Sequence, residues 1–257
     1  MLSPLTTGIY TGLGAVGAVG LAWGGCAYAA LWPGSQVFGP TMTAPRKPGE
    51  LALTFDDGPN PAWTPRLLDL LASCDARATF FLIGSRAKVE TRLVRRIVEG
   101  GHLIGNHTWS HPNLALTAAG RVREELKRTQ EILEQTAGVP VRFFRPPFGA
   151  RRPAVLKIAR ELGLTTVLWN AMTSDWKEPS AARIAGRISQ TIDGLERRGL
   201  AANIVLHDGN HLERRGNRGP SVDAAGRLLA RYKDSHRFVT VDAWEPAVRQ
   251  PLAGGSH

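Results

Sequence analysis

The chain has 257 residues, of which 43% are hydrophobic, and this is enough for one well-buried α/β domain but short for two. A formal net charge of +10 indicates attraction to polyanions such as anionic lipid, acidic wall polymer or nucleic acid, although a solvated basic surface explains the charge equally well. No nucleic-acid-binding motif accompanies the charge, so we expect no specific nucleic-acid partner.

The first 45 residues carry no charged side chain. Residues 9–31 are long enough to cross a bilayer as a helix, so we predict a hydrophobic membrane anchor within residues 1–35. A cleaved signal segment is the alternative, but the basic leading region of such a segment is missing. The first charges are Arg46 and Lys47, and the positive-inside rule would keep the following domain in the cytoplasm. We expect a membrane-anchored or extracytoplasmic protein and leave its sidedness open.

Residues 36–49 are predicted to be a short proline-marked linker, residues 50–245 the main domain, and residues 246–257 a C-terminal tail. In the main domain, apolar runs rich in β-branched and aromatic residues alternate with helical patterns. The seven predicted strands are Leu51 to Phe55, Ala78 to Ile83, His102 to Asn106, Arg142 to Arg145, Thr165 to Trp169, Asn203 to Leu206 and Phe238 to Val241.

Helix ends are predicted between these strands. Thr64, Thr117 and Ser180 are placed to open helices, the second of which runs to Thr136. Three glycines are placed to close helices, namely Gly138, Gly163 and Gly199. Strands separated by helices imply parallel pairing through right-handed crossovers, and about seven units favour an α/β barrel, complete or incomplete, over an open doubly wound sheet. No glycine-rich dinucleotide fingerprint follows the first strand, which weakens the open-sheet alternative.

Polar residues follow the predicted strands at their carboxyl ends. In a parallel barrel these ends converge on one rim, so residues distant in sequence would meet there. They are Asp56 and Asp57 after the first strand, His107 and His111 after the third, Arg145 at the end of the fourth, Asp175 and Trp176 after the fifth, and His207 and Asp208 after the sixth. This coincidence predicts a single active site.

Two adjacent carboxylates, Asp56 and Asp57, would repel each other if buried, and a cation is the simplest compensation. A plain turn is the alternative, because Asp, Gly and Pro all form turns. His107 and His111 are four residues apart, which lets two imidazoles reach one ion, and Pro112 favours a loop there over a long helix. Taken alone, such a histidine pair is structural or incidental as often as it is a catalytic metal site. Two histidines and one carboxylate leave open positions on a zinc-like ion, as a catalytic site requires.

Arg145 precedes a rigid turn that would hold its guanidinium near the rim. Taken alone, the pattern is equally that of an arginine next to a tight loop, with no role in a site. His207 ends an apolar run and is either a capped, hydrogen-bonded histidine or a proton donor, and its place at the shared rim favours the donor.

Five motifs together resemble the polysaccharide deacetylases, the carbohydrate esterases with a NodB-homology domain. The motifs are Thr54 to Pro59 (TFDDGP), His107 to His111 (HTWSH), Arg145 to Gly149 (RPPFG), Ser174 to Trp176 (SDW) and Leu206 to Asp208 (LHD). The likeness covers roughly residues 50–245 and implies an α/β fold, a distorted, incomplete (β/α)7 barrel.

The resemblance also implies a role for each matching position. Asp57, His107 and His111 match the ligands of a divalent metal, commonly zinc, with cobalt, nickel or manganese as alternatives. Asp56 matches the general base and His207 the general acid, while Arg145 and Asp175 match the residues that orient and tune this pair. Trp176 and Leu206 match the walls around the acetyl methyl group, Phe148 the backbone donor of the oxyanion site, and Pro147 lies among the substrate-binding positions.

Two features depart from the family pattern or lie outside it. Phe148 stands where a tyrosine is frequent, so a hydroxyl is lost although the backbone N–H is kept. The basic loop Asn210 to Gly219 lies beside the predicted acid, and we favour a solvated surface over a substrate contact for it.

We predict a hydrolase that removes N-acetyl groups from a glycan containing N-acetylglucosamine, either chitin-like or peptidoglycan, and acts as a monomer. A related metal hydrolase acting on a small cyclic imide is one alternative, because the same site would serve it. A membrane-anchored wall-binding module without turnover is another, but a pure binder has no need of Asp56 and His207.

Overall fold

The computed structural model describes residue 25 and residues 27–245. Most of the predicted membrane segment, residues 9–31, and the tail, residues 246–257, lie outside this part of the chain. Within the described residues, no helix is long and apolar enough to cross a membrane.

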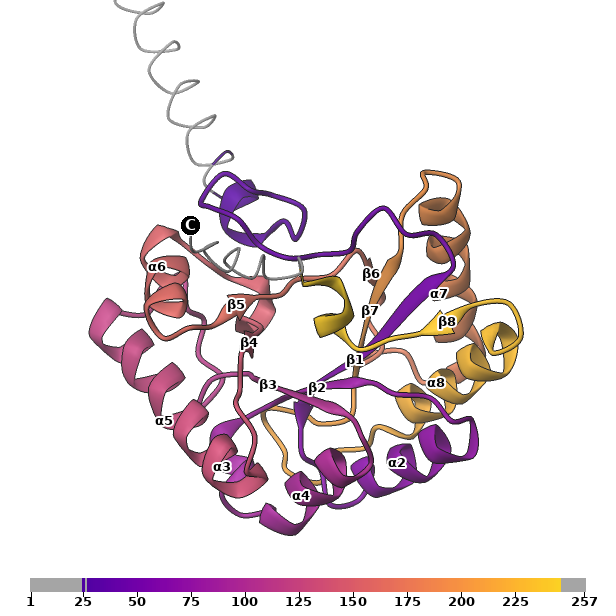
Figure 1. Cartoon of the computed structure of the whole chain (residues 1–257), viewed down its shortest axis with the longest axis horizontal. Helices are drawn as coiled ribbons and strands as arrows, with labels where there is room; N and C mark the ends of the chain where they lie inside the picture. The colour runs from indigo at the N-terminus through magenta and orange to yellow at the C-terminus, as the bar shows by residue number, and fades with distance from the viewer. Residues whose placement is uncertain (1–24, 26, 246–257) are drawn as a thin grey trace, which may run out of the picture.

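One curled parallel sheet forms the centre of the molecule, with helices on its outer face (Figure 1). Its strand order is β5-β4-β3-β2-β1-β7-β6, and β8 pairs with β1. The strands are β1 (Glu50–Gly58), β2 (Thr79–Leu82), β3 (Leu103–Asn106), β4 (Phe143–Phe144), β5 (Thr165–Thr166), β6 (Ala171–Met172), β7 (Ala202–His207) and β8 (Arg237–Phe238). Because β5 and β6 end the path without pairing with each other, the barrel is incomplete, as the motifs predicted.

The helices bury one apolar face each against the sheet, and the main core lies between the two layers. They are α2 (Thr64–Ser73), α3 (Gly84–Ala87), α4 (Thr91–Glu99), α5 (Ala119–Ala137), α6 (Pro153–Glu161), α7 (Ala181–Glu196) and α8 (Gly219–Tyr232), with short 3₁₀ turns at η1 (Pro147–Gly149) and η2 (Val241–Trp244). Long aliphatic rows and the stacked rings of Phe55 and Phe80 fill this interface.

Each predicted strand overlaps an observed one, but the last, Phe238 to Val241, shares only Phe238 with β8, since Val241 begins η2. The strand β6 was not predicted. Two residues, Ala171 and Met172, are too few to show a period in the sequence, and they pair with Ile204 and Val205 of β7. The predicted helix starts were only partly right. Ser180 caps α7, since its side chain accepts a hydrogen bond from the Arg183 backbone.

Thr64 and Thr117, which were expected to open helices, do not cap them. The caps of α2 and α5 are Trp63 and Ala118, which have no side-chain hydrogen bond to the helix. Thr64 instead accepts a hydrogen bond from the Asn60 backbone and donates one to Asp208, so its hydroxyl serves the loop above β1.

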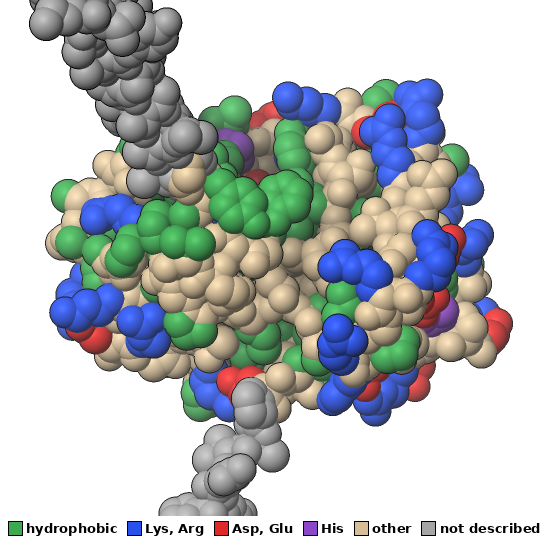
Figure 2. Space-filling view, turned by 90° about the horizontal axis from the view of Figure 1, so that it is seen from above, with side chains coloured by type: hydrophobic (Ala, Val, Ile, Leu, Met, Phe, Trp, Pro, Cys, Tyr) green, Lys and Arg blue, Asp and Glu red, His purple; other side chains and the backbone are tan. Residues whose placement is uncertain are grey.

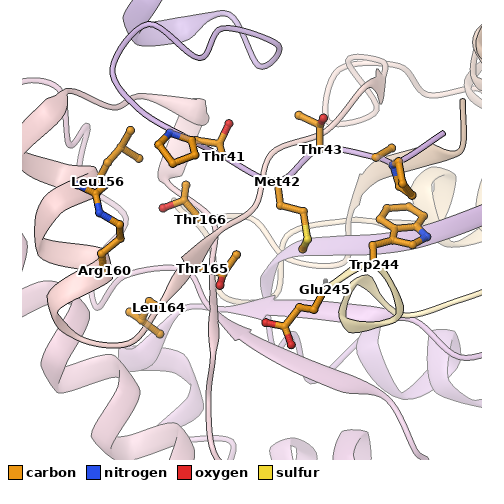
Figure 3. A pocket seen from close by; sticks show the side chains of 13 residues that line it. Thr41, Met42, Thr43, Leu156, Arg160, Leu164, Thr165, Thr166, Trp244 and Glu245 are labelled. Atoms are coloured by element: carbon orange, nitrogen blue, oxygen red, sulfur yellow. The ribbon is translucent and has the colours of Figure 1, made fainter. Parts of the chain in front are cut away.

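Residues 40–45 run along the open side of the barrel. Met42 donates its backbone N–H to Thr166 at 2.9 Å and accepts one from Leu168 at 2.7 Å, while Pro45 accepts from Ala201 at 3.0 Å. A cavity of about 540 Å³ remains beside this segment, between Thr41 to Thr43 on one side and Thr165, Thr166, Trp244 and Glu245 on the other (Figure 3). The segment therefore lies across the gap between β5 and β6 rather than apart from the barrel.

Candidate active site

The carboxyl end of β1 carries both aspartates. Asp56 lies in register with His207 of the neighbouring β7, so these two residues are brought side by side by strand pairing alone. Asp57 follows with a φ of 69°, and its carbonyl accepts a hydrogen bond from Arg86 at 3.1 Å. In a regular strand successive side chains point to opposite faces, but after this turn both carboxylates line the same cavity.

Polar side chains in and around the HTWSH motif shape the loop that carries the two histidines. Asn106 accepts the backbone N–H of Thr108 at 2.9 Å, and the Thr108 hydroxyl accepts that of His111 at 3.0 Å. Buried Glu125 of α5 holds both the backbone N–H and the hydroxyl of Ser110. These bonds stabilise a tight loop instead of the helix that a four-residue histidine spacing also permits.

Three potential metal-binding side chains meet at the rim. Ligand atoms of Asp57, His107 and His111 all lie within 4.8 Å of one another, and all three residues are buried. Asp57 Oδ1 is 3.0 Å from His111 Nε2 and 3.5 Å from His107 Nε2, yet it is buried without a hydrogen bond of good geometry within the described chain. The donor set and this unsatisfied oxygen fit a divalent cation.

The protonation of these groups also suits a cation. His107 Nδ1 lies 2.8 Å from the carbonyl of Arg145 and must donate to it, which leaves a lone pair on Nε2. Burial lowers the pKa of His111 from its ordinary value, against the opposing influence of Asp57, and so favours the neutral imidazole.

Unusual backbone geometry is concentrated at this rim. Five non-glycine residues in the described chain have a positive φ, and four of them lie in the site motifs, at Asp57, Thr108, His111 and Phe148. Such conformations are unfavourable for residues with a Cβ and persist where the surrounding structure imposes them, frequently at functional sites.

Arg145 holds the second carboxylate. Its guanidinium is fully buried and donates to Asp56 Oδ1 at 2.8 Å and to the Thr54 hydroxyl at 2.7 Å. The ring of Phe81 lies beneath it, 4.1 Å from the guanidinium carbon to the ring centroid. Because its charge is compensated by Arg145, Asp56 stays beside the triad, with Oδ2 4.0 Å from His107 Nε2.

His207 is held by a carboxylate on the opposite side of the cavity. Asp175 accepts from His207 Nδ1 and from the His207 backbone N–H, each at 2.8 Å, and from the Ser221 hydroxyl at 2.6 Å. Burial alone would lower the pKa of His207, but the charge of Asp175 and its hydrogen bond raise it to about 9. At neutral pH the ring is therefore an imidazolium, with its second N–H available to donate.

A cavity of about 520 Å³ joins these groups. It is lined by Asp56, Asp57, His107, His111, Phe148, Trp169, Met172, Trp176, Val205, His207, Asn210, His211, Leu212 and Arg218. Of the predicted site residues, Arg145 and Asp175 act on this cavity through the side chains that they hold. Leu206 and Pro147 are buried and do not line it, so their contact with substrate stays a prediction.

Sequence reasoning missed several lining residues, and the most important is His211. It belongs to the basic loop that we expected to be solvated, and it lies 3.5 Å from Asp57 Oδ2. The rest of the loop is mixed, since residues 212–215 are exposed, while Arg218 is buried and donates to the Gly209 carbonyl. A histidine four residues after His207 was the available signal, but it falls in none of the five motifs.

The fold and the cluster of Asp57, His107 and His111 are those expected of a metal-dependent hydrolase. The sequence model of the polysaccharide deacetylase family matches residues 43–167. A peptidoglycan-N-acetylglucosamine deacetylase of Bacillus cereus is 38% identical over 203 residues, which cover 78% of this chain and 70% of that protein. A chitooligosaccharide deacetylase of Azorhizobium caulinodans is 36% identical over 175 residues, which cover 68% of this chain and 80% of that protein.

A solved structure of similar fold is a pseudoenzyme of the CE4 family from Bacillus anthracis, with a TM-score of 0.70, 25% identity, and coverage of 79% of this chain and 68% of that one. The chain belongs to the polysaccharide deacetylase family. The resemblance read from the five motifs is thereby confirmed, as is the incomplete barrel that it implied.

Proposed function

We propose that this protein is a metal-dependent N-deacetylase acting on glycans that contain N-acetylglucosamine. The observation that carries the proposal is the pairing of Asp56 with His207 across β1 and β7, with the Asp57, His107 and His111 triad opening into the same cavity. A base, an acid and a cation site are thus presented to one bound group. The similarity to peptidoglycan and chitooligosaccharide deacetylases supports this class of substrate.

Asp57, His107 and His111 would hold the cation, and zinc is the proposed metal because one oxygen and two imidazole nitrogens suit it. Cobalt, nickel or manganese would fit the same donors. When bound, the cation would supply Lewis-acid polarisation of the amide carbonyl and a lowered pKa for water.

Asp56 would accept a proton from the attacking water. Its two oxygens have different environments, since Oδ1 receives the hydrogen bond from Arg145 while Oδ2 lies 4.0 Å from His107 Nε2. The Arg145 contact fixes the carboxylate in an orientation in which one oxygen remains free for the proton.

His207 would deliver a proton to the departing nitrogen, because an amine leaves poorly as its anion. The hydrogen bond to Asp175 occupies Nδ1, so Nε2 is the donating atom. The ring stands edge-on to Trp176, with centroids 5.2 Å apart, and this contact limits its rotation.

The remaining walls suit a small acyl group. Met172, Trp176 and Val205 give the cavity an apolar side that would receive the acetyl methyl group. The backbone N–H of Phe148, in its left-handed conformation, would donate to the oxygen on which negative charge develops, a contact worth about 3 kcal/mol.

Acetate release is the test of this proposal. Zinc-loaded protein should release acetate from N-acetylglucosamine oligomers or from peptidoglycan, and an Asp56→Asn variant should not. Hydrolysis of a small cyclic imide without acetate release from any glycan would favour the other amidohydrolase activity. Tight glycan binding with no turnover at any pH or metal would place the chain with non-catalytic members of the fold.

We also propose that residues 9–31 anchor the protein in a membrane. The sequence there is uncharged, and Tyr28 and Trp32, stacked 6.1 Å apart, are more than half exposed, as expected of aromatic residues at a membrane surface. Buried Arg151 donates to the carbonyls of Trp32 at 2.7 Å and Gly149 at 3.0 Å, so Trp32 is fixed to the turn that carries Phe148.

Figure 2 shows one face of the molecule, with hydrophobic side chains gathered near its middle and Lys and Arg toward its margin. Protease protection in intact and opened cells tests the anchor and its sidedness. Release of the whole protein by high salt would contradict the anchor, and protection of the domain in intact cells would place it in the cytoplasm.

A further inference from the structure

His211 lies against two of the three proposed metal ligands. Its Nδ1 is 3.5 Å from Asp57 Oδ2, and its ring is stacked on that of His111, with centroids 4.3 Å apart and 17° between the planes. Phe148 meets both imidazoles edge-on, at centroid distances of 4.8 Å and 5.6 Å. The His211 side chain is 31% exposed, whereas those of the three proposed ligands are 5% exposed or less.

The carboxylate of Asp57 needs a hydrogen-bond donor that is not itself a metal ligand. The Nδ1 hydrogen of His107 is used on the Arg145 carbonyl, so its Nε2 faces Asp57 Oδ1 with a lone pair and cannot donate. His111 must likewise present a lone pair from Nε2 in order to ligate. Among the described side chains within ion-pair distance of this carboxylate, His211 is the remaining one that can donate, and its Nδ1 lies 3.5 Å from the other oxygen, Oδ2.

His111 lacks the support that a ligating histidine normally has. Such a residue usually donates its other ring N–H to a carbonyl or carboxylate, as His107 does. Within the described chain, His111 Nδ1 is buried without a hydrogen-bond partner. The orientation of its ring is therefore set by packing between His211 and Phe148.

We propose that His211 is a positioning residue of the metal centre. Its Nδ1–H holds Oδ2 of Asp57, so that Oδ1 is left to face the cation, and its ring fixes the plane of the His111 imidazole. The proposal rests on the metal site of the proposed function. Outer partners of metal ligands typically change metal affinity by about 10-fold to 100-fold when removed, and we expect a loss of this size here.

The test is a metal-binding measurement on the full chain, purified in detergent and stripped with a chelator. Zinc affinity is measured by competition with a chromophoric chelator, and the site geometry by the absorption spectrum of the cobalt form. His211→Ala should weaken zinc binding about 10-fold to 100-fold and alter the cobalt spectrum. His211→Phe, which keeps the stack, and His211→Asn, which keeps a donor, should each restore part of the affinity.

Arg215→Ala is the matched control, because Arg215 is an exposed residue of the same loop, and its zinc affinity should equal that of the unaltered protein. Unchanged affinity and spectrum in His211→Ala would overturn the proposal. Loss of one nitrogen ligand from the cobalt spectrum of that variant would also overturn it, since His211 would then be a ligand itself. Failure of the unaltered protein to bind zinc would remove the metal site, and the positioning role with it.

Discussion

The environment of His207 sets the pH at which the proposed acid works. Its pKa is raised to about 9 because the ionised Asp175 outweighs the effect of burial, and only the protonated ring can donate. Activity should therefore be lost as pH rises through the pKa of His207. A bound cation nearby would lower that pKa, which places the alkaline limb between about 6.5 and about 9.

Asp175→Asn should move this alkaline limb of kcat/KM to lower pH, since the largest influence that raises the pKa of His207 is removed. A pH–rate profile of acetate release measures the shift. Ser221→Ala, which removes one hydrogen bond but keeps the charge of Asp175, should shift the limb less. An alkaline limb that stays in place in Asp175→Asn would show that His207 is not the group that titrates.

Asp208 makes a second prediction at the residue scale. It is fully buried, and burial raises its pKa from an ordinary 3.8 to about 7, with repulsion from Asp57 acting in the same direction and the Thr64 hydrogen bond opposing it. Between these pH values the unfolded chain releases a proton that the folded chain keeps, so stability falls as pH rises.

Asp208→Asn should flatten this dependence in the metal-free protein. Urea unfolding at a series of pH values between about 4 and 7 gives the free energy of unfolding for both proteins. The unaltered protein should lose stability across this window more steeply than the variant. Parallel curves would mean that Asp208 is ionised in the folded state throughout.

Close packing between strand ends determines the site at the scale of elements. The end of β7 is pressed against the turn after β1, and a Cβ built on Gly209 would lie 1.8 Å from the carbonyl oxygen of Asp57. A side chain there must displace the backbone that carries the carboxylate proposed to bind the metal.

Gly209→Ala should thus destabilise the protein by roughly 2 kcal/mol or more and weaken metal binding. Gly186→Ala is the matched control, because Gly186 lies inside α7 with open space around it, and alanine should stabilise that helix by about 0.5 to 1 kcal/mol. Thermal unfolding and zinc titration measure both effects. Equal stability of the two variants would contradict the close approach.

Elements marked by an apolar run or a periodic apolar pattern were predicted from the sequence. Elements that depend on contacts between distant segments were missed. Strands such as β1 and β7 are continuous apolar runs and were recognised, whereas β6 has two residues and is visible only through its pairing with β7. Site residues at strand ends were predicted because parallel strands converge. His211 was missed because its position depends on the path of an irregular loop, which no period in the sequence describes.

The charge of the whole molecule gives a prediction about substrate size and sign. The full chain carries a formal charge of +10, and such a field attracts an acidic wall polymer but has little effect on a neutral oligomer. The attraction weakens as added salt shortens the Debye length from about 30 Å at 0.01 M to about 3 Å at 1 M.

Raising the salt concentration over this range should lower kcat/KM for an anionic glycan by about 10-fold and leave that for neutral N-acetylglucosamine oligomers nearly unchanged. Initial rates of acetate release on both substrates provide the comparison. An equal decline of kcat/KM on both substrates would mean that salt acts on the active site and not through the charge of the surface.

The central claim is that Asp57, His107 and His111 hold a cation while Asp56 is left free to take a proton. Parallel titration of the unaltered protein and Asp56→Asn with zinc, with acetate release followed at each step, tests this directly. The two proteins should have equal zinc affinities, and the rate of acetate release should fall by about 10²-fold to 10⁴-fold in the variant. Equal rates in the two proteins, or loss of zinc binding in Asp56→Asn, would contradict it.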